Sequence, residues 1–356
     1  MRIGKWTAAA GATAVVVGAY SAYWLIAAGK IEHGLERWAE ERRAEGYEVE
    51  LGHPVITGFP TRFRVDIPHP LIGREASGWI WQAERLRAEA PPWRVGAMEF
   101  TLSGRHALRL LRGDLWQDIA CAIERGRADL RVDSKGRLTD LDIEISDYEI
   151  DSPEFAAPAT GRALTLSIRR DYPETPDHQS ETVSLSLRLD RLTLPPDMYL
   201  GLGKEVERVA LDAVVKGPLT DAKLSRALAD WRDAGGTVEV ERLELRWGPV
   251  ELETNGTLAL DPEMRPLGAF AAKITGYGDV VDALVMNKLV PLGDAFLFKI
   301  AFHLLAKPTE PGGPPTLDLP LTVQDGNLVV GTVRLMEIPP LLPPETSVLN
   351  ETAPKP

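Results

Sequence analysis

The chain contains a run of 24 residues, Trp6–Gly29, without a charged side chain. At about 1.5 Å per residue a helix of this length reaches about 36 Å, enough to cross a hydrocarbon core of about 30 Å. A helix also satisfies every backbone amide within its own segment, as the bilayer interior requires. Ala and Gly dominate the run, so insertion depends on a few residues such as Leu25 and Ile26. We predict a signal anchor, a transmembrane helix, over residues 1–29.

Three aromatic residues, Tyr20, Tyr23 and Trp24, lie near the far end of this run. Tyr and Trp are enriched at membrane interfaces because their rings are apolar and their tips are polar. We therefore predict that these three residues are membrane anchors.

The competing interpretation is a cleaved signal peptide, with the small residues 27–29 near the processing site. The run is longer than the usual apolar region of a signal peptide, and bulky residues crowd the region where small ones are needed. The uncleaved anchor is therefore favoured.

Orientation depends on basic residues on both sides of the run. Arg2 and Lys5 precede it, whereas Lys30, Arg37, Arg42 and Arg43 come after it. The short N-terminal tail and the signal-like layout favour an N-terminus inside the cell. The expected location is the inner (cytoplasmic) membrane, crossed once, with the bulk of the chain in the periplasm.

Residues 30–46 are predicted to form an amphipathic connecting helix. Ile31, Leu35 and Trp38 fall on one helical stripe, and Gly46 ends the segment.

From Tyr47 onward the apolar period changes from about 3.6 to 2. Phe63, Val65 and Ile67, for example, alternate with charged residues, as in strands that have one apolar and one solvated face. At least a dozen such runs occur. The predicted fold class is mainly β: an N-terminal transmembrane helix followed by an extended, curved antiparallel β-sheet with a few short helices. The β-rich exported domain is expected over 47–338, and a division into two halves near 195–205 stays open.

Short helices are predicted where apolar residues recur at helical spacing: around 224–235, 280–286 and 296–304, with further helices near 105–112 and 115–124. The Pro-rich tail, 339–356, is expected to be disordered. Trp79 and Trp81 share one strand face, and we interpret this pair as core packing.

Composition excludes several functions. A net charge of −12 disfavours nucleic acid as a partner, because phosphate binding requires basic surfaces. Cys121 is the single cysteine, so no internal disulfide forms, and the six histidines have no ligand-like spacing. The sequence indicates no catalytic, cofactor-binding or metal-binding residues, and we expect a protein that is not an enzyme and uses no cofactor.

The segment Gly58-Phe59-Pro60-Thr61-Arg62-Phe63 is distinctive. Gly permits a positive φ and Pro fixes φ for a tight turn, so the segment predicts a hairpin corner from which both Phe rings can reach the core. The structural interpretation of Gly58, Phe59, Pro60 and Arg62 is favoured, and a binding role for Arg62 is the alternative.

These motifs resemble those of an uncharacterised family of bacterial cell-envelope proteins. The corner matches the family's early G-F/Y-P-x-R-F turn, and the C-terminal β segment matches at Trp231–Gly236, Trp247-Gly248-Pro249, Gly256–Leu260, Arg265-Pro266-Leu267-Gly268, Leu319-Pro320-Leu321 and Asp325-Gly326. The family layout is similar to that of AsmA-like envelope proteins, whose exported sheets are thought to carry lipids between membranes. This is a likeness of fold alone and assigns no residue a role.

The resemblance, together with the number of long alternating strands and the few helices to cover them, implies a membrane-anchored envelope protein that binds or transports lipid on an apolar sheet face. Membrane lipid is the expected partner, as anchor and as cargo. The alternative is a structural module that binds another envelope protein along a sheet edge.

Overall fold

The computed structural model describes residues 3–94, 96–112, 115–220, 224–288, 290–308, 314–330 and 333–341. The predicted tail falls mostly on 342–356 and lies outside these residues. By their internal contacts the residues form two compact units. The N-terminal unit comprises 1–169 and 188–199, and the C-terminal unit comprises 170–187 and 200–356.

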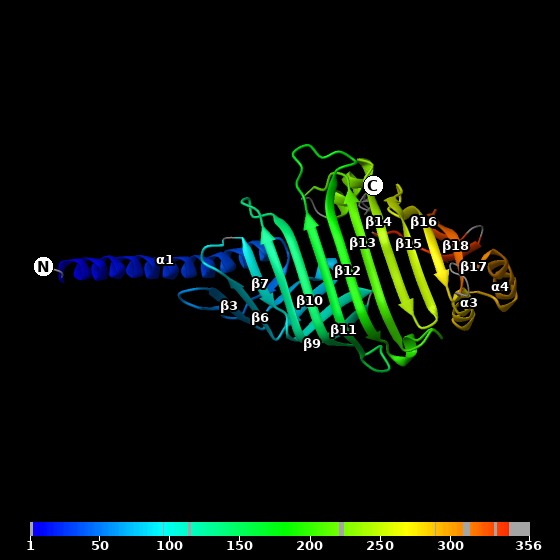
Figure 1. Cartoon of the computed structure of the whole chain (residues 1–356), viewed down its shortest axis with the longest axis horizontal. Coiled ribbons are helices and arrows are strands. Elements are labelled where there is room, and N and C mark those ends of the chain that lie inside the picture. Colours follow the sequence, from blue (N-terminus) through cyan, green and yellow to red (C-terminus); the bar gives the residue numbers. More distant parts are fainter. Residues whose placement is uncertain are drawn as a thin grey trace, which may run out of the picture. The chain divides into compact units, whose positions relative to one another are not determined.

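A single helix, α1 (Ile3–Ala44), begins the N-terminal unit. It joins the two predicted segments, 1–29 and 30–46, into 42 continuous residues, and it projects beyond the strands of its unit (Figure 1). Gly46, with a φ of 86°, permits the reversal after the helix. Among the described residues α1 is the one helix long and apolar enough to cross a membrane, and its most apolar stretch is only 6% buried. This low burial rules out a core helix and fits a membrane anchor or a signal sequence.

In the part of the chain that the structure describes, the N-terminal unit contains eleven strands and two single-turn 3₁₀ helices. They are β1 (Glu48–Glu50), β2 (Val55–Thr57), β3 (Phe63–Pro68), β4 (Leu71–Arg74), β5 (Trp79–Ala83), β6 (Arg85–Ala90), β7 (Ala97–Thr101), β8 (Gly104–Arg112), β9 (Leu115–Val132), β10 (Leu138–Asp151), β11 (Ala159–Arg170), and the turns Glu75–Ser77 and Pro196–Met198. Strand β12 (Glu181–Thr193) divides between the units at residue 188.

The sheet of the N-terminal unit forks at β9. Along one edge β9 pairs with β10, which in turn pairs with β11. Along its other edge the first half of β9 pairs with β8 and the second half with β7. Two branches result, β8–β5–β4–β1 and β7–β6–β3–β2, and all pairs are antiparallel. Because one 18-residue strand supports both branches, they diverge on either side of its midpoint.

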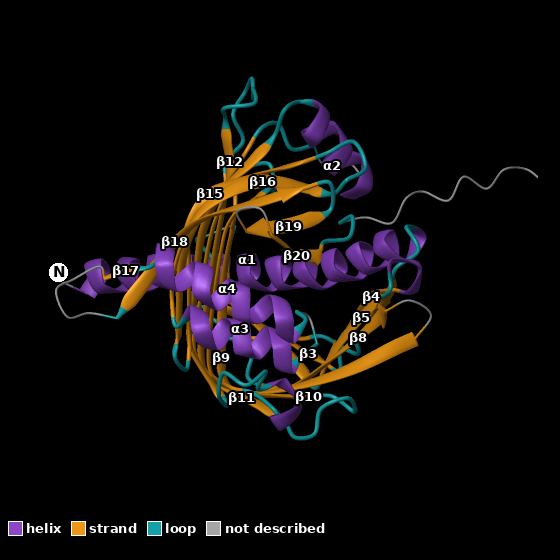
Figure 2. Ribbon diagram, turned by 90° about the vertical axis from the view of Figure 1, so that its right-hand side faces the viewer, coloured by secondary structure: helices purple, strands orange, loops and turns teal. Residues whose placement is uncertain are grey.

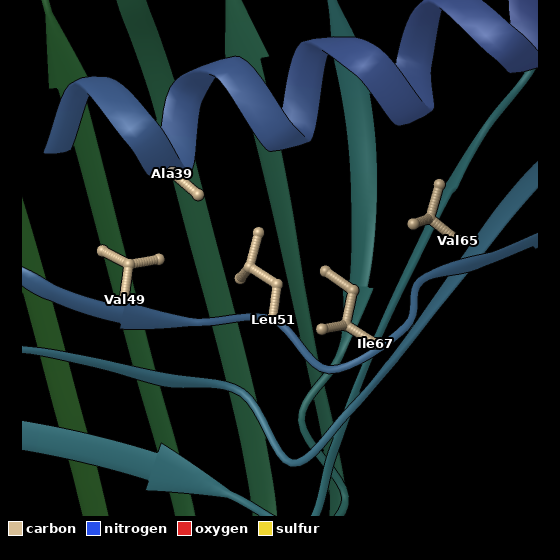
Figure 3. Packing of buried hydrophobic residues seen from close by; sticks show 5 residues of the cluster. All are labelled: Ala39, Val49, Leu51, Val65 and Ile67. Atoms are coloured by element: carbon tan, nitrogen blue, oxygen red, sulfur yellow. The ribbon is translucent and has the colours of Figure 1, made fainter. Parts of the chain in front are cut away.

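The C-terminal end of α1 fills the space between the two branches. Ala39 is 2% exposed and belongs to one buried cluster with Val49 and Leu51 from the β1 side and with Val65 and Ile67 from β3 (Figure 3). Ile31 and Leu35 of the predicted amphipathic stripe pack against the same cluster. Ile31 and Leu35 therefore contact protein, and because they are partly buried each contributes less than the about 1.5–3 kcal/mol of a fully buried side chain.

The C-terminal unit contains a second antiparallel series, β13–β14–β15–β16–β18–β19–β20, with β17 also on β18. The strands are β13 (Glu205–Lys216), β14 (Thr237–Trp247), β15 (Val250–Leu260), β16 (Pro266–Thr275), β17 (Lys307–Pro308), β18 (Pro315–Gln324), β19 (Asn327–Val330) and β20 (Val333–Glu337). The helices are α2 (Leu224–Asp233), α3 (Tyr277–Met286) and α4 (Leu292–Leu305), and α3 lies beside α4 (Figure 2). These three helices fall where the sequence predicted them.

The predicted helices at 105–112 and 115–124 are wrong, because these residues form β8 and the first part of β9. Ala, Leu and Arg favour helix locally, but the pairing of β8 with both β5 and β9 outweighs that propensity. In β9, Ala120 and Ala122 alternate with Ile119, Cys121 and Ile123. Because alanine is small and apolar rather than charged, the two-residue alternation of apolar and polar residues was obscured.

The predicted fold class is confirmed. The structure is mainly β, with one long N-terminal apolar helix, few short helices and a large antiparallel sheet that is not closed.

Candidate functional site

An apolar cavity of about 400 Å³ lies on the sheet of the N-terminal unit. A volume of this size falls in the usual range for small-molecule sites, about 300–1,000 Å³. Its lining comes from β5, β8, β9 and β10 and the loop just before β8: Trp81, Leu102, His106, Ala107, Leu108, Ile119, Cys121, Ile123 and Ile150. With His106 and Cys121 as the two exceptions, every lining side chain is apolar.

Strand pairing explains why these residues share one face. Trp81 is opposite Leu108, and Leu108 is opposite Ile119, so three strands contribute one continuous row. A second row runs from His106 to Cys121 and on to Ile150. Directly opposed side chains in antiparallel strands lie about 4.5–5.5 Å apart at Cβ, which makes each row contiguous.

The two polar members of the cavity are constrained. A ring nitrogen of His106, Nε2, donates to the Leu102 carbonyl at 2.7 Å, and the ring stacks on Trp81 with centroids 5.9 Å apart. Burial raises the pKa of the Cys121 thiol. The thiol therefore favours its neutral form at the wall of the cavity.

Farther along β10 and β11, apolar side chains are only half-buried. Leu141 faces Ile168, Ile143 faces Leu166, and Ile145 faces Leu164, and all six side chains are intermediate in exposure. Paired rows of this kind are usually buried under a second layer. Within the described part of the N-terminal unit these rows keep apolar area accessible.

The second candidate region is the junction between α1 and the hairpin corner. Residues 58–62 connect β2 to β3, and the turn is closed by the Arg62 amide, which donates to the Gly58 carbonyl at 3.0 Å. Gly58 has a φ of 100°, and a Cβ there would lie 2.7 Å from the Arg62 carbonyl oxygen. This position therefore requires glycine.

The three aromatic residues predicted as membrane anchors meet this corner. The Tyr20 hydroxyl donates to the Pro60 carbonyl, and the Trp24 indole donates to the Arg62 carbonyl at 3.3 Å. The Tyr23 hydroxyl donates to the Pro92 carbonyl at 3.0 Å. The structure therefore brings together two sets of residues for which the sequence predicted separate roles.

Aromatic packing completes the junction. Trp24 is 6% exposed, stacks on Phe63 at a centroid distance of 5.2 Å and meets the edge of Phe59 at 5.6 Å. Phe59 is itself 51% exposed, so it covers Trp24 on one side and faces outward on the other. Of the two Phe rings expected to reach the core, Phe63 does so and Phe59 does not.

Arg62 is engaged by a carboxylate rather than free to bind a ligand. Its guanidinium bonds Glu89 at 2.9 Å, and Arg64 bonds the other oxygen of Glu89 at 2.6 Å. Hydrogen bonds from Arg64 and Arg62 lower the pKa of Glu89. The charged Glu89 thus holds the corner against β6, which favours the structural interpretation of Arg62.

The C-terminal unit presents a different surface on α4. Leu292, Phe296, Leu297 and Leu304 are 77%, 67%, 62% and 79% exposed. The other side of the helix packs on α3 through Ala295, Phe298 and Phe302. An exposed row of large apolar side chains marks an interaction surface more often than a plain solvent face.

Sequence reasoning missed the cavity. With residues 105–112 and 115–124 expected to be helical, His106, Leu108, Ile119 and Cys121 do not fall on one face. Trp81, interpreted as core packing, is half-buried at the cavity wall. The alternation of Ile119, Cys121 and Ile123 was the signal available. No group of His, Cys, Asp and Glu suited to a metal occurs among the described residues.

A profile of a family described as uncharacterised proteins conserved in bacteria, DUF2125, matches residues 24–339. The match begins within α1 at Trp24 and continues past β20, so it includes the corner, the cavity and α4. No curated protein and no solved structure matches the chain.

The junction predicts an asymmetry between two tryptophans of α1. Trp24→Ala removes a buried ring from the corner and is expected to destabilise the N-terminal unit by about 3–5 kcal/mol, the usual cost of such a truncation. Hydrogen exchange of the amides at 58–62 should rise strongly in the full chain. Trp38→Ala is the control, since Trp38 is 39% exposed on the same helix. Equal exchange in the two variants contradicts the junction.

Proposed function

We propose that this chain, which belongs to the DUF2125 family of uncharacterised proteins conserved in bacteria, is a membrane-anchored envelope protein that binds lipid acyl chains on an apolar sheet face. Binding of this kind is the elementary step that lipid transport between membranes requires. We propose in addition that the protein is not an enzyme.

The apolar cavity of the N-terminal unit carries the proposal. Its wall offers Leu, Ile, Ala and Trp side chains and almost no hydrogen-bonding capacity, which suits hydrocarbon better than sugars or nucleotides. Each CH₂ group of an acyl chain that leaves water contributes about 0.8 kcal/mol. A ligand that covers the cavity and the neighbouring rows therefore gains affinity from area alone.

The half-buried rows on β10 and β11 support the same ligand class. They lie on β10, which contributes Ile150 to the cavity wall, and on its neighbour β11. An elongated apolar ligand fits a row of paired strands better than a compact one does.

Residues at the cavity argue against catalysis. His106 lies directly opposite Cys121 on the neighbouring strand, so a ring and a thiol are neighbours at the cavity wall. A nucleophilic cysteine needs a lowered pKa, whereas burial raises the pKa of Cys121. The Nε2 proton of His106 is committed to the Leu102 carbonyl.

The lipid proposal predicts a contrast between adjacent residues of β9. Ile119→Glu places a carboxylate in the cavity and is expected to reduce copurifying lipid about tenfold or more, since 1.4 kcal/mol corresponds to tenfold in affinity. Ala120→Glu is the matched control, because Ala120 is exposed and lies outside the lining set. Lipid extracted from the purified full chain is measured by mass spectrometry.

Cys121 gives an independent readout in the same protein. As the single cysteine and a lining residue, it should react with a maleimide more slowly after an acyl ligand is added. Absence of lipid in the wild-type extract, together with unchanged Cys121 reactivity, removes the lipid proposal.

We also propose that α1 crosses the inner membrane once, with the bulk of the chain in the periplasm. The uncharged run, the basic residues before it and the low burial of its apolar stretch support this placement.

A fusion behind residue 340 tests the orientation. A reporter active only outside the cytoplasm is expected to be active, and a reporter active only inside is expected to be silent. The mass of the purified chain shows whether residues 1–29 are retained, as the anchor requires. The reverse reporter pattern contradicts the placement.

A second candidate function is a module that binds another envelope protein. The exposed apolar side of α4 favours it, because a helix that buries one side and presents four large residues on the other resembles half of a helix-in-groove contact. Such a partner requires no lipid in the cavity.

If α4 binds another envelope protein, the full chain is expected to capture one stoichiometric envelope protein in a pull-down. Phe296→Ser combined with Leu304→Ser is expected to abolish that capture. Lys299→Ser is the control, because Lys299 lies on α4 and its substitution removes only an exposed ion pair with Asp282 of α3. Capture that survives the double substitution, or no capture by wild type, rejects this function for α4.

A further inference from the structure

Two connections of the N-terminal unit meet α1 at one level. Residues 58–62 bond Tyr20 and Trp24 through the carbonyls of Pro60 and Arg62. Residues 91–94, which follow β6, bond Tyr23 through the carbonyl of Pro92 at 3.0 Å. We name residues 58–62 and 91–94 the collar. Three hydrogen bonds fix its position along the helix.

The collar carries large exposed rings of its own. Phe59 is 51% exposed and Trp93 is 69% exposed. Since the polar atoms of Tyr20, Tyr23 and Trp24 are used by protein carbonyls, the outward-facing aromatic surface at this level comes from the collar and from Tyr23, which is 48% exposed. An exposed basic residue, Arg94, follows Trp93 directly in the chain.

Helix length places the collar relative to a bilayer. From Ile3 to Ala19, α1 has 17 residues before Tyr20, about 26 Å at 1.5 Å per residue, and the charge-free part from Trp6 to Ala19 has 14 residues, about 21 Å. A span shorter than the hydrocarbon thickness of about 30 Å is accommodated by local thinning of the bilayer. The side chains just before the collar, Val15, Val16 and Val17, are 72%, 67% and 56% exposed, so none of them is covered by protein.

We propose that the collar is a membrane-seating surface, with Phe59 and Trp93 inserted among the lipid headgroups around the exit of α1 and with Arg94 at the level of the phosphates. This inference rests on the proposed membrane placement of α1. The collar is hydrogen-bonded to α1 at the end of the proposed membrane span. When α1 crosses the bilayer, the collar therefore lies at the bilayer surface, so lipid is the partner that contacts it.

The chemistry of the collar fits that occupant. Aromatic rings favour the interface, and guanidinium groups pair with phosphate. The acidic remainder of the chain, with a net charge of −12, gains nothing from anionic headgroups, so the attraction is local. Because the collar loops are hydrogen-bonded to α1, they also determine the distance between the cavity-bearing sheet and the lipid surface.

Spin labels on single cysteines test the depth of the collar. Cys121→Ser gives a cysteine-free full chain, which is reconstituted in vesicles of phosphatidylethanolamine and phosphatidylglycerol. Labels are placed at Phe59→Cys and Trp93→Cys, and their relaxation is compared with oxygen and with a water-soluble nickel chelate. Both labels are expected to be several-fold less accessible to the chelate than a control label at Leu115→Cys.

Leu115 is a matched control because it is 75% exposed in the same unit and lies at the opposite end of β9 from the collar. The first residue of β7, which comes after the collar in the chain, pairs with Arg131 near the other end of that strand. Collar labels as accessible to the chelate as the Leu115 label overturn the proposal.

A label at Val16→Cys separates this inference from the membrane placement itself. If the Val16 label is buried in lipid and the collar labels are exposed to water, only the membrane-seating role of the collar is rejected. If the Val16 label is exposed to water, both the membrane placement of α1 and the role of the collar are rejected. Collar labels shielded from oxygen and chelate alike, or broadened by a second copy, indicate a protein contact and also overturn it.

Fluorescence gives a second measurement without cysteine substitution. Brominated lipids quench tryptophans that lie at the interface. The fluorescence intensity lost to quenching should fall in Trp93→Phe and stay unchanged in Trp116→Phe, since Trp116 lies on the first half of β9. Equal quenching in the two variants contradicts the seating of Trp93.

Discussion

The contact between Trp24 and the hairpin corner determines how the N-terminal unit is built around its helix. One indole stacks on Phe63, abuts Phe59 and donates to the Arg62 carbonyl. The corner presents that carbonyl because Gly58 takes a positive φ, and Glu89 holds it in place through Arg62 and Arg64. Side-chain packing, turn chemistry and an ion pair thus converge on one residue of α1, Trp24, which lies within the charge-free run of the helix.

The forked sheet depends on the same arrangement. Ala39, one of the smallest side chains, allows the end of α1 to approach both branches, and the cluster with Val49, Leu51, Val65 and Ile67 closes that end of the unit. The other end of the unit is different. On β10 and β11 apolar rows stay half-buried, although full burial of each Leu or Ile is worth about 1.5–3 kcal/mol. An apolar surface left accessible at this cost is the physical basis of the proposed lipid binding, because a hydrocarbon ligand restores the burial that the fold omits.

Prediction from sequence succeeded where the signal is local and periodic. The two-residue alternation indicated the β class, and the spacing of Leu224, Leu228 and Trp231 indicated α2. The prediction was wrong at β8 and β9. There Ala and Arg favour a helix locally, whereas the strand conformation depends on pairing with other strands. The cavity was missed for the same reason, since its wall exists only after β5, β8, β9 and β10 are placed in register.

The sequence by itself determined that the chain begins with an apolar helix, that strands dominate the rest of the chain, and that residues 58–62 make a tight turn, because length, period and Gly-Pro chemistry act within a few residues. Tertiary structure decided what these features contact. Tyr20, Tyr23 and Trp24 are typical of a lipid interface when considered alone, but folding brings the Pro60, Arg62 and Pro92 carbonyls to them. Such pairings join residues about 40 to 70 positions apart, and no local pattern encodes them, because hydrogen-bond partners at that separation are chosen by strand register and packing.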